Sequence, residues 1–265
     1  MYTRFQLAKK YLRYYLTASN GKGHGIHSPF IFDFVQHVLI DKCDYPVYQS
    51  IEKIRKQLLN NSTVIEVEDF GAGSSVIKTN QRAVSAIAAS SLKPKKYAQL
   101  LYRMVQYYKP QTIVELGTSF GITTSYLASA NDTSKVFTCE GSAAIAAIAR
   151  RNFQTLQLKN IQLTEGDFAK TLSPLLSSLD KIDFAFIDGN HRKEPTIEYF
   201  NQLLNHVTPQ TILVFDDIHW SAGMEEAWAA IKGHPAVTLT IDLFFISIVF
   251  FNPDFNHKQH FTIRV

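Results

Sequence analysis

The chain is organised around the segment Thr112-Ile113-Val114-Glu115-Leu116-Gly117-Thr118-Ser119-Phe120-Gly121. Its first half is apolar and partly β-branched, which favours a short buried strand. Gly117 allows a sharp turn, and Gly121 opens a segment of helical composition. A strand, a glycine turn and a helix start form a nucleotide cradle, because bare backbone and unpaired N–H groups face the ligand. The alternative is an ordinary strand-to-helix connection, since the spacing Glu-x-Gly-x-x-x-Gly is not the dinucleotide pattern.

Four further apolar stretches follow, and each ends in a polar or acidic turn. The first ends at Glu140, about 20 residues after the glycine turn, where an acid can bind both hydroxyls of a ribose. The others end in Glu165-Gly166-Asp167, in Asp188-Gly189-Asn190-His191 and in Asp216-Asp217. Helix-like segments separate the stretches, and parallel α/β sheets bind ligands at the carboxyl ends of their strands. The pattern predicts a nucleoside-binding α/β domain.

Composition is that of an ordinary globular protein. The 265 residues are 46% hydrophobic and 19% charged, with a net charge of +4 that permits an acidic or nucleic-acid partner without requiring one. Cys43 and Cys139 are too few for a disulfide framework. No apolar core of the signal-peptide type is found at the N-terminus, and the run Leu243–Phe251 is too short to cross a bilayer. We therefore expect a cytoplasmic enzyme without a membrane partner.

These motifs resemble the class I S-adenosylmethionine-dependent methyltransferases. The resemblance rests on the segment 115–121, Glu140, Gly166-Asp167, the segment 187–191 and Phe215-Asp216-Asp217. Within the class they are most similar to the metal-dependent O-methyltransferases of the catechol type. The resemblance implies a doubly wound, mostly parallel, seven-stranded Rossmann-like sheet with a C-terminal antiparallel hairpin. Apolar runs at 237–241, 243–251 and 260–265 fit this ending, with Asn252–Asn256 as the turn of the hairpin.

A mainly helical region precedes this domain. The best boundary between the two regions is Lys93-Pro94-Lys95. Residues 1–95 are expected to cover the substrate or to contact another subunit, and residues 96–265 to form the methyltransferase domain. Residues 1–16 carry an aromatic stripe at helical spacing between basic residues. Such a helix can lie on a membrane, but packing on its own protein or on a second subunit of a homodimer is the commoner arrangement.

Two loops of the N-terminal region contain candidate ligand-binding residues. His24 and His27 lie in the loop Asn20–His27, which we interpret as a structural turn or a cover for the active site rather than a metal site. The loop Asp69–Ser74 is similar to a second nucleotide turn. No acid-tipped strand follows it at the proper distance, so we interpret it as a loop near the substrate.

The resemblance also implies how the cofactor, S-adenosyl-L-methionine, is held. Gly117 lies beneath its methionine part, while Glu115 and Thr123 contact the amino and carboxylate ends. Glu140 holds the ribose hydroxyls, and Asp167 the adenine amino group. The expected cofactor-binding residues are Glu115, Gly117, Thr118, Ser119, Gly121, Thr123, Glu140, Asp167 and Asp188. For two of them a structural role is the alternative, Thr123 as a first-turn helix residue and Asp167 as a helix N-cap.

Three carboxylates, those of Asp188, Asp216 and Asp217, are expected in one crevice at neighbouring strand ends. Uncompensated, they would repel one another and take up protons, and Mg²⁺ or a similar ion removes this repulsion. Such an ion orients a substrate hydroxyl and lowers its pKa. The related enzymes have an acid–amide pair where this chain has Asp216-Asp217. As an alternative, Asp188 contacts cofactor or substrate directly and Asp217 caps the next helix.

His191 occupies the place where catechol-type relatives have a lysine base. Because imidazole accepts a proton near neutral pH, we predict His191 and Asp188 as catalytic residues. A surface position or metal ligation stays open for His191. Trp220 either stacks on a planar substrate or seals a helix against the sheet.

The sequence thus predicts a methyltransferase that acts on the oxygen of a small hydroxylated molecule with a divalent ion. An RNA methyltransferase is the first alternative, since related folds modify hydroxylated tRNA bases and the N-terminal region carries Lys53, Arg55 and Lys56. The second is a non-catalytic module that binds S-adenosylmethionine. Against it stand His191, Asp216 and Asp217, which nucleoside binding does not need.

Overall fold

The computed structural model describes residues 1–19, 21, 28–68, 80–255 and 257–265. They form two compact units: residues 42–178 make up one, and residues 1–41 with 179–265 the other. The predicted region 1–95 contributes to both units, and its role stays a prediction. His24, His27 and the loop Asp69–Ser74 lie outside the described residues, so the structure does not test them.

Three parallel strands are the centre of the unit formed by residues 42–178. They are β3 (Thr112–Leu116), β4 (Lys135–Glu140) and β5 (Ile161–Glu165), with β4 in the middle. Burial falls from β3 to β5: β3 is buried over its last four residues, β4 at three positions, and β5 is exposed or half-buried throughout. The strands predicted here are confirmed.

Helices connect these parallel strands, because a parallel pair needs a crossover. The connecting helices are α6 (Ile122–Ala130) and α7 (Ala143–Thr155), and α8 (Phe168–Ser177) follows β5. Before β3, the described residues of this unit form a short antiparallel pair and three helices. These elements are α3 (Pro46–Leu59), β1 (Val64–Glu66), β2 (Gln81–Ala83), α4 (Val84–Ser91) and α5 (Lys95–Tyr108).

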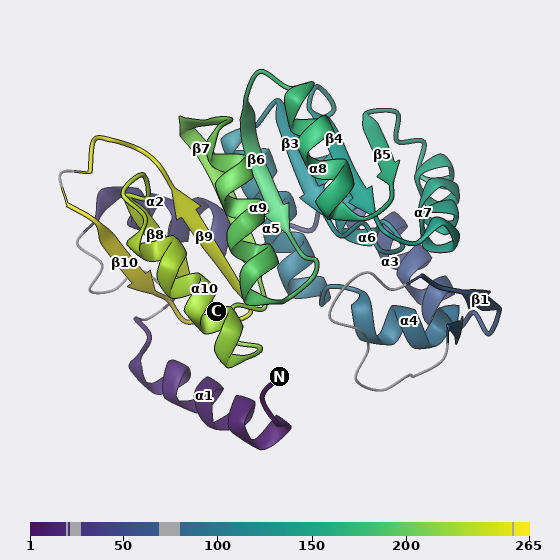
Figure 1. The fold of residues 1–265 in the computed structure, drawn as a ribbon, viewed down its shortest axis with the longest axis horizontal. Coiled ribbons are helices and arrows are strands. Elements are labelled where there is room, and N and C mark those ends of the chain that lie inside the picture. Colours follow the sequence, from purple (N-terminus) through teal and green to yellow (C-terminus); the bar gives the residue numbers. More distant parts are fainter. Residues whose placement is uncertain (20, 22–27, 69–79, 256) are drawn as a thin grey trace. The chain divides into compact units, whose positions relative to one another are not determined.

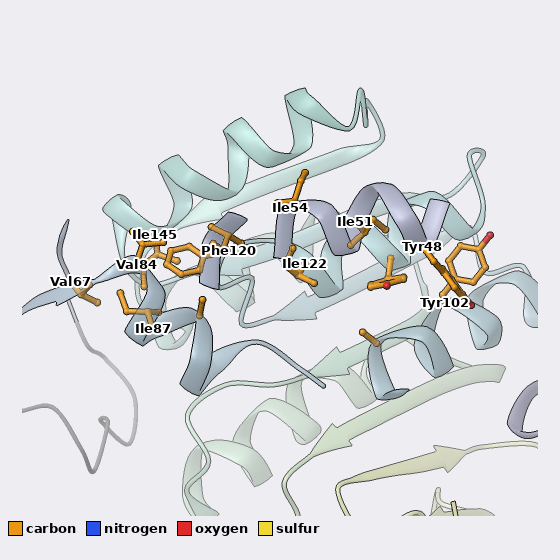
Figure 2. Close-up of a cluster of buried hydrophobic side chains, with 14 residues drawn as sticks. Tyr48, Ile51, Ile54, Val67, Val84, Ile87, Tyr102, Phe120, Ile122 and Ile145 are labelled. Carbon is orange, nitrogen blue, oxygen red and sulfur yellow. The ribbon is translucent and has the colours of Figure 1, made fainter. Parts of the chain in front are cut away.

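A cluster of buried apolar side chains from α3, α4, α5 and α6 forms part of the core of this unit (Figure 2). The rings of Tyr48 and Tyr102 meet edge to face, with centroids 5.0 Å apart. Phe120, from the turn after β3, and Ile122, from the start of α6, are buried in the same cluster. Burial of Phe120 in this cluster therefore fixes the glycine turn to the core of the unit.

Five strands form the sheet of the other unit, in the order β10-β8-β9-β7-β6. β6 (Ile182–Ile187) and β7 (Val207–Asp216) are parallel, and β9 (Ile246–Phe250) runs antiparallel to β7 and to β8 (Leu239–Asp242). β10 (Gln259–Thr262) lies parallel to β8. Helices α9 (Lys193–Leu204) and α10 (Ala222–Gly233) pack against each other, as Figure 1 shows.

The mostly parallel, Rossmann-like fold with a C-terminal antiparallel hairpin is confirmed, but the hairpin has another turn. β8 and β9 form it around Leu243–Phe245, whereas the prediction placed its turn at Asn252–Asn256. The last strand joins β8 in parallel because β9 already has hydrogen-bonded neighbours on both edges. In the described residues, the parallel group of one unit has three strands and the sheet of the other has five, together one more than the seven predicted.

The first helices of the chain belong to the same unit as the C-terminal strands. They are α1 (Arg4–Thr17), α2 (Pro29–Phe34) and a π-helical turn at Val35–Leu39. The Tyr14 hydroxyl donates to the carbonyl of Ile263, and the Ser19 N–H donates to Thr262 at 2.9 Å. No helix in the described ranges is both long and apolar enough to cross a membrane.

Candidate functional site

The turn after β3 has an unusual backbone. Gly117, Ser119 and Gly121 have φ angles of 103°, 48° and 76°, in the left-handed region that favours glycine. The N–H groups of Gly117 and Thr118 donate to the carbonyl of Cys139 at 3.0 and 3.1 Å. The Gly121 N–H donates to the carbonyl of Thr118 at 2.8 Å. The turn thus closes on itself and is tied to the end of β4.

Gly121 is required by space as well as by φ. A Cβ atom there would lie 2.4 Å from the ring of Phe153 in α7, closer than any real contact. The missing side chain therefore lets α6 begin directly against α7.

Glu140, at the end of β4, faces this turn. Its Oε2 accepts from the Ser119 N–H at 2.8 Å, and its Oε1 accepts from the Ser142 N–H at 3.0 Å. These two backbone donors fix the carboxylate relative to the turn. A fixed carboxylate beside a glycine turn is what the binding of ribose hydroxyls requires.

Glu115 is fully buried at the end of β3. Its Oε2 accepts from the hydroxyls of Thr124 and Thr138, at 2.5 and 2.6 Å. Its Oε1 is buried and has no hydrogen-bond partner among the described residues. Burial raises the pKa of the carboxyl to about 7, against the opposite effect of the two hydroxyls. A buried acceptor of this kind fits a cationic donor such as the amino group of the cofactor's methionine part.

Asp167 and Thr123 have the structural roles considered as alternatives. Asp167 is the N-cap of α8 and accepts from the Ala169 N–H at 3.1 Å. Thr123 is buried in the first turn of α6. Their contacts with the cofactor stay predictions.

In the unit of residues 1–41 and 179–265, a second group of candidate site residues, with carboxylate and imidazole side chains, lies where β6 and β7 end. Ile187 of β6 is paired with Phe215 of β7, so the next residues, Asp188 and Asp216, are neighbours. Asp188, His191 and Asp216 each offer a ligand atom within 4.8 Å of the others. Asp216 is buried, and the other two are half-buried. Two carboxylates and an imidazole are a donor set that binds divalent cations.

His191 joins this group because of the tight turn after β6. Asn190 has a φ of 55°, and this left-handed residue turns the chain back after Asp188. The Nε2 atom of His191 then lies 3.6 Å from Oδ1 of Asp188. The Gly189-Asn190 pair in the sequence favours such a turn, because both residue types adopt left-handed conformations readily.

Asp217 is not part of this group of ligand atoms. Its φ is 51°, and its N–H donates to the carbonyl of Phe245 at 2.8 Å. The N-cap of α10 is Ser221, so Asp217 does not cap that helix. Asp217 and Trp220 instead line a small pocket of about 40 Å³, together with Leu7, His219, Phe244 and Phe245.

His219 was not singled out from the sequence, yet it is held firmly beside this pocket. Its Nδ1 lies 3.0 Å from a carboxylate oxygen of Glu225, and its Nε2 lies 2.9 Å from one of Asp242. Its ring stacks on Phe244 with centroids 4.9 Å apart. Burial lowers the pKa of His219, but the two carboxylates outweigh burial and raise it. Asp242 is 23 residues away, and Glu225, six residues away, lies beyond the turn that begins α10, so spacing alone did not reveal either partner.

Comparison with known proteins places both groups of residues in one family segment. Residues 114–218 match a family described as a methyltransferase domain. Among curated protein sequences none matches this chain. The solved structures below are similar to it at identities that show the fold alone.

An O-methyltransferase from Bacillus cereus in complex with SAH is 20% identical, with a TM-score of 0.57, over 83% of this chain and 97% of that one. An SAH-bound methyltransferase from Podospora anserina is 15% identical, with a TM-score of 0.56, over 80% of this chain and 98% of that one. The SAM complex of a Streptomyces achromogenes O-methyltransferase involved in tomaymycin synthesis is 18% identical. Its TM-score is 0.53, over 61% of this chain and 82% of that one.

Proposed function

We propose that this chain, which carries a methyltransferase domain of the class I S-adenosylmethionine-dependent type, methylates a hydroxyl oxygen of a small acceptor with the help of a divalent ion. One observation supports the proposal above all. The matched residues 114–218 contain two groups of residues: a glycine turn with a buried, unsatisfied carboxylate oxygen, and a carboxylate–imidazole group at two strand ends. Nucleoside binding alone does not need the second group.

The residues of the glycine turn fit the cofactor. Oε1 of Glu115 would accept from the ammonium of the methionine part, and Glu140 would hold the ribose hydroxyls. Gly117 keeps the backbone bare beneath them. S-adenosylmethionine supplies, when bound, a methyl group on a positively charged sulfur.

The second group of residues would prepare the acceptor. As the acceptor oxygen attacks the methyl carbon, a C–O bond forms, the C–S bond breaks, and the hydroxyl proton must leave. His191 would take this proton, and Asp188, 3.6 Å from its Nε2, would stabilise the resulting imidazolium. Asp188 and Asp216 would hold the ion, which lowers the pKa of the acceptor hydroxyl. Mg²⁺ prefers oxygen ligands, so the imidazole is left for the proton.

A small acceptor is supported by what the similar folds do. The Streptomyces achromogenes O-methyltransferase is involved in tomaymycin synthesis, and its structure covers 61% of this chain. Labelled methyl transfer into extracts of small molecules, with RNA as the second extract, tests this part. Label in RNA alone would contradict a small acceptor and leave methyl transfer standing.

The cofactor assignment is tested by calorimetry. We expect micromolar binding of S-adenosylhomocysteine and far weaker binding of NAD. Glu140→Ala should cost about 1–3 kcal/mol of binding free energy, because the ribose hydroxyls lose their acceptor. Glu165→Ala is the matched control, since Glu165 ends the next strand and forms an ion pair with Arg150. Equal binding of NAD, or equal losses in both variants, would contradict the assignment.

The metal is tested separately. EDTA should abolish turnover, and Mg²⁺ should restore it and raise the melting temperature. Asp188→Asn and Asp216→Asn should lose the metal-dependent turnover and keep most of the affinity for S-adenosylhomocysteine. Asp183→Asn, a change on β6, the strand that precedes Asp188, is the control. His191→Gln should lower the rate without releasing the metal. Full turnover in EDTA would contradict the role of the ion, and loss of the metal from His191→Gln would make His191 a ligand.

A further inference from the structure

Helix α1 has two apolar faces, and only one of them packs on the protein. On the inner face Tyr14 is buried with Phe244, and the ring of Tyr11 meets Phe244 edge to face at 5.0 Å. Of the aromatic rings that the sequence predicts to form a packed stripe, Tyr11 makes this contact, whereas Phe5 and Tyr15 are exposed. On the outer face Phe5 is 81% exposed, Leu12 57% and Leu16 73%.

The exposed apolar residues form one continuous stripe. Phe5, Leu12 and Leu16 are seven and four residues apart, and at about 100° per residue such spacings fall on one side of a helix. Tyr15 extends the stripe at its border and is 45% exposed. The guanidinium of Arg264 lies over the ring of Tyr15, 4.7 Å from its centroid.

Basic side chains border this stripe on both sides. Arg4 lies on one border, and Lys9 and Arg13 lie on the other, and all three are exposed. In the described part of the chain none of the three has an ion-pair partner, and α1 contains no acidic residue. The fourth basic residue, Lys10, turns inward and pairs with Glu225 at 2.9 Å. The inner cation of α1 is thus paired with a carboxylate, whereas the three outer cations have no acidic partner among the described residues.

Two occupants could cover an apolar stripe between cations. In a two-fold dimer the same face meets itself, so Arg4, Lys9 and Arg13 would approach their own copies without an acid on α1 to compensate. An anionic lipid surface offers hydrocarbon for the stripe and negative headgroups for its borders. We propose that α1 holds this protein on an anionic lipid surface, with Phe5, Leu12 and Leu16 in the hydrocarbon boundary. In Figure 1, α1 is the purple helix next to α10.

Flotation of the full chain with vesicles tests this inference. One vesicle set is phosphatidylcholine alone, and the other contains phosphatidylglycerol as well. We expect binding to the anionic set, weakened by salt, and little binding to the neutral set. Replacing both Lys9 and Arg13 by Gln should lower the partition coefficient about 25-fold, at about five-fold for each basic residue near an anionic surface. Leu12→Gln with Leu16→Gln should abolish binding at any salt concentration.

Leu59→Gln is the matched control, because Leu59 is an exposed leucine at the end of another helix. Melting temperature and affinity for S-adenosylhomocysteine, measured for every variant, show that each is folded. Equal binding to both vesicle sets, or no binding to either, would overturn the proposal. So would a wild-type dimer in sedimentation experiments that the two leucine changes convert to a monomer, since this result would assign the stripe to a second copy.

Discussion

The Glu115 carboxylate is fully buried, and one of its oxygens accepts hydrogen bonds from two hydroxyls. Its other oxygen has no hydrogen-bond partner among the described residues. Its pKa of about 7 means that in the free protein part of the molecules carry a proton on this carboxyl near neutral pH. An ammonium group beside Oε1 would favour the ionised form and lower the pKa. Under the proposed function, cofactor binding is therefore coupled to release of a proton.

This coupling predicts how cofactor affinity depends on pH. Affinity for S-adenosylhomocysteine should rise as the pH increases toward about 7, because fewer molecules then have to lose a proton. Calorimetry in two buffers of different ionisation enthalpy should detect proton release in the wild type and none in Glu115→Gln. An affinity independent of pH in the wild type would remove Glu115 from the cofactor contact.

The same carboxyl predicts a trend in the stability of the free protein. Its folded pKa is raised from 4.5, so its contribution to stability is fully present below pH 4.5 and is lost as the pH rises through about 7. Glu115→Gln should therefore gain stability relative to the wild type between pH 5 and pH 8. Denaturant unfolding at both pH values measures the difference, and Glu165→Gln is the control.

Single residues also show which features of the site could be predicted from the sequence and which could not. Glu115 and Glu140 could be predicted, because their place at a strand end follows from the chain alone. The orphaned oxygen of Glu115 could not, since it depends on Thr124 and Thr138 sharing the other oxygen. The shared position of Asp188, His191 and Asp216 was predicted from neighbouring strand ends, whereas the exclusion of Asp217 from their ligand atoms was not.

At the scale of elements, the glycine turn is fixed from two sides. Phe120 is buried with α3, α4 and α5, while the start of α6 lies against Phe153 of α7. Strands and helices around this turn could be predicted from apolar runs and turn residues. The pairing of β10 with β8 could not, because a strand's partner is set by which edges distant strands leave open.

Gly121→Ala tests the rigidity of this turn. The new Cβ would meet the Phe153 ring and would sit at a positive φ, so we expect a loss of about 1–3 kcal/mol in the free energy of unfolding. Adding Phe153→Leu should recover the part of this free-energy loss that comes from the clash. The part that comes from the positive φ should remain. Gly233→Ala is the control, since a Cβ there has nothing within 4 Å. Equal effects of both glycine changes on denaturant unfolding would contradict the packing argument.

At the scale of the whole molecule, residues far apart in the chain complete one unit. Lys10 and Tyr2 bond Glu225, and Leu7 lines the same pocket as Asp217 and Trp220. No sequence pattern links these segments. The predicted division at residue 95 stays a prediction for the same reason, because compact units follow contacts between distant residues.

Removal of the N-terminal segment tests this organisation. Deleting Met1–Ile26 should lower acceptor turnover more than affinity for S-adenosylhomocysteine, because Leu7 lines the pocket of Trp220 while Glu115 and Glu140 lie among residues 42–178. Steady-state kinetics and calorimetry on the same preparation separate the two effects. Lys10→Gln, which removes one ion pair and keeps the helix, is the control. An unchanged turnover would exclude a role of this segment at the acceptor.

The hydrogen bond between Ser19 and Thr262, the last residue of β10, also has a consequence for synthesis. A ribosome makes α1 before β10, and the acceptor of the Tyr14 hydroxyl, the carbonyl of Ile263, is synthesised 249 residues later. Residues 42–178 are contiguous and need no such delay, whereas the other unit stays incomplete until the final strand emerges. During that interval both apolar faces of α1 are open to chaperones. Loss of a few C-terminal residues is therefore expected to release a helix at the opposite end of the chain.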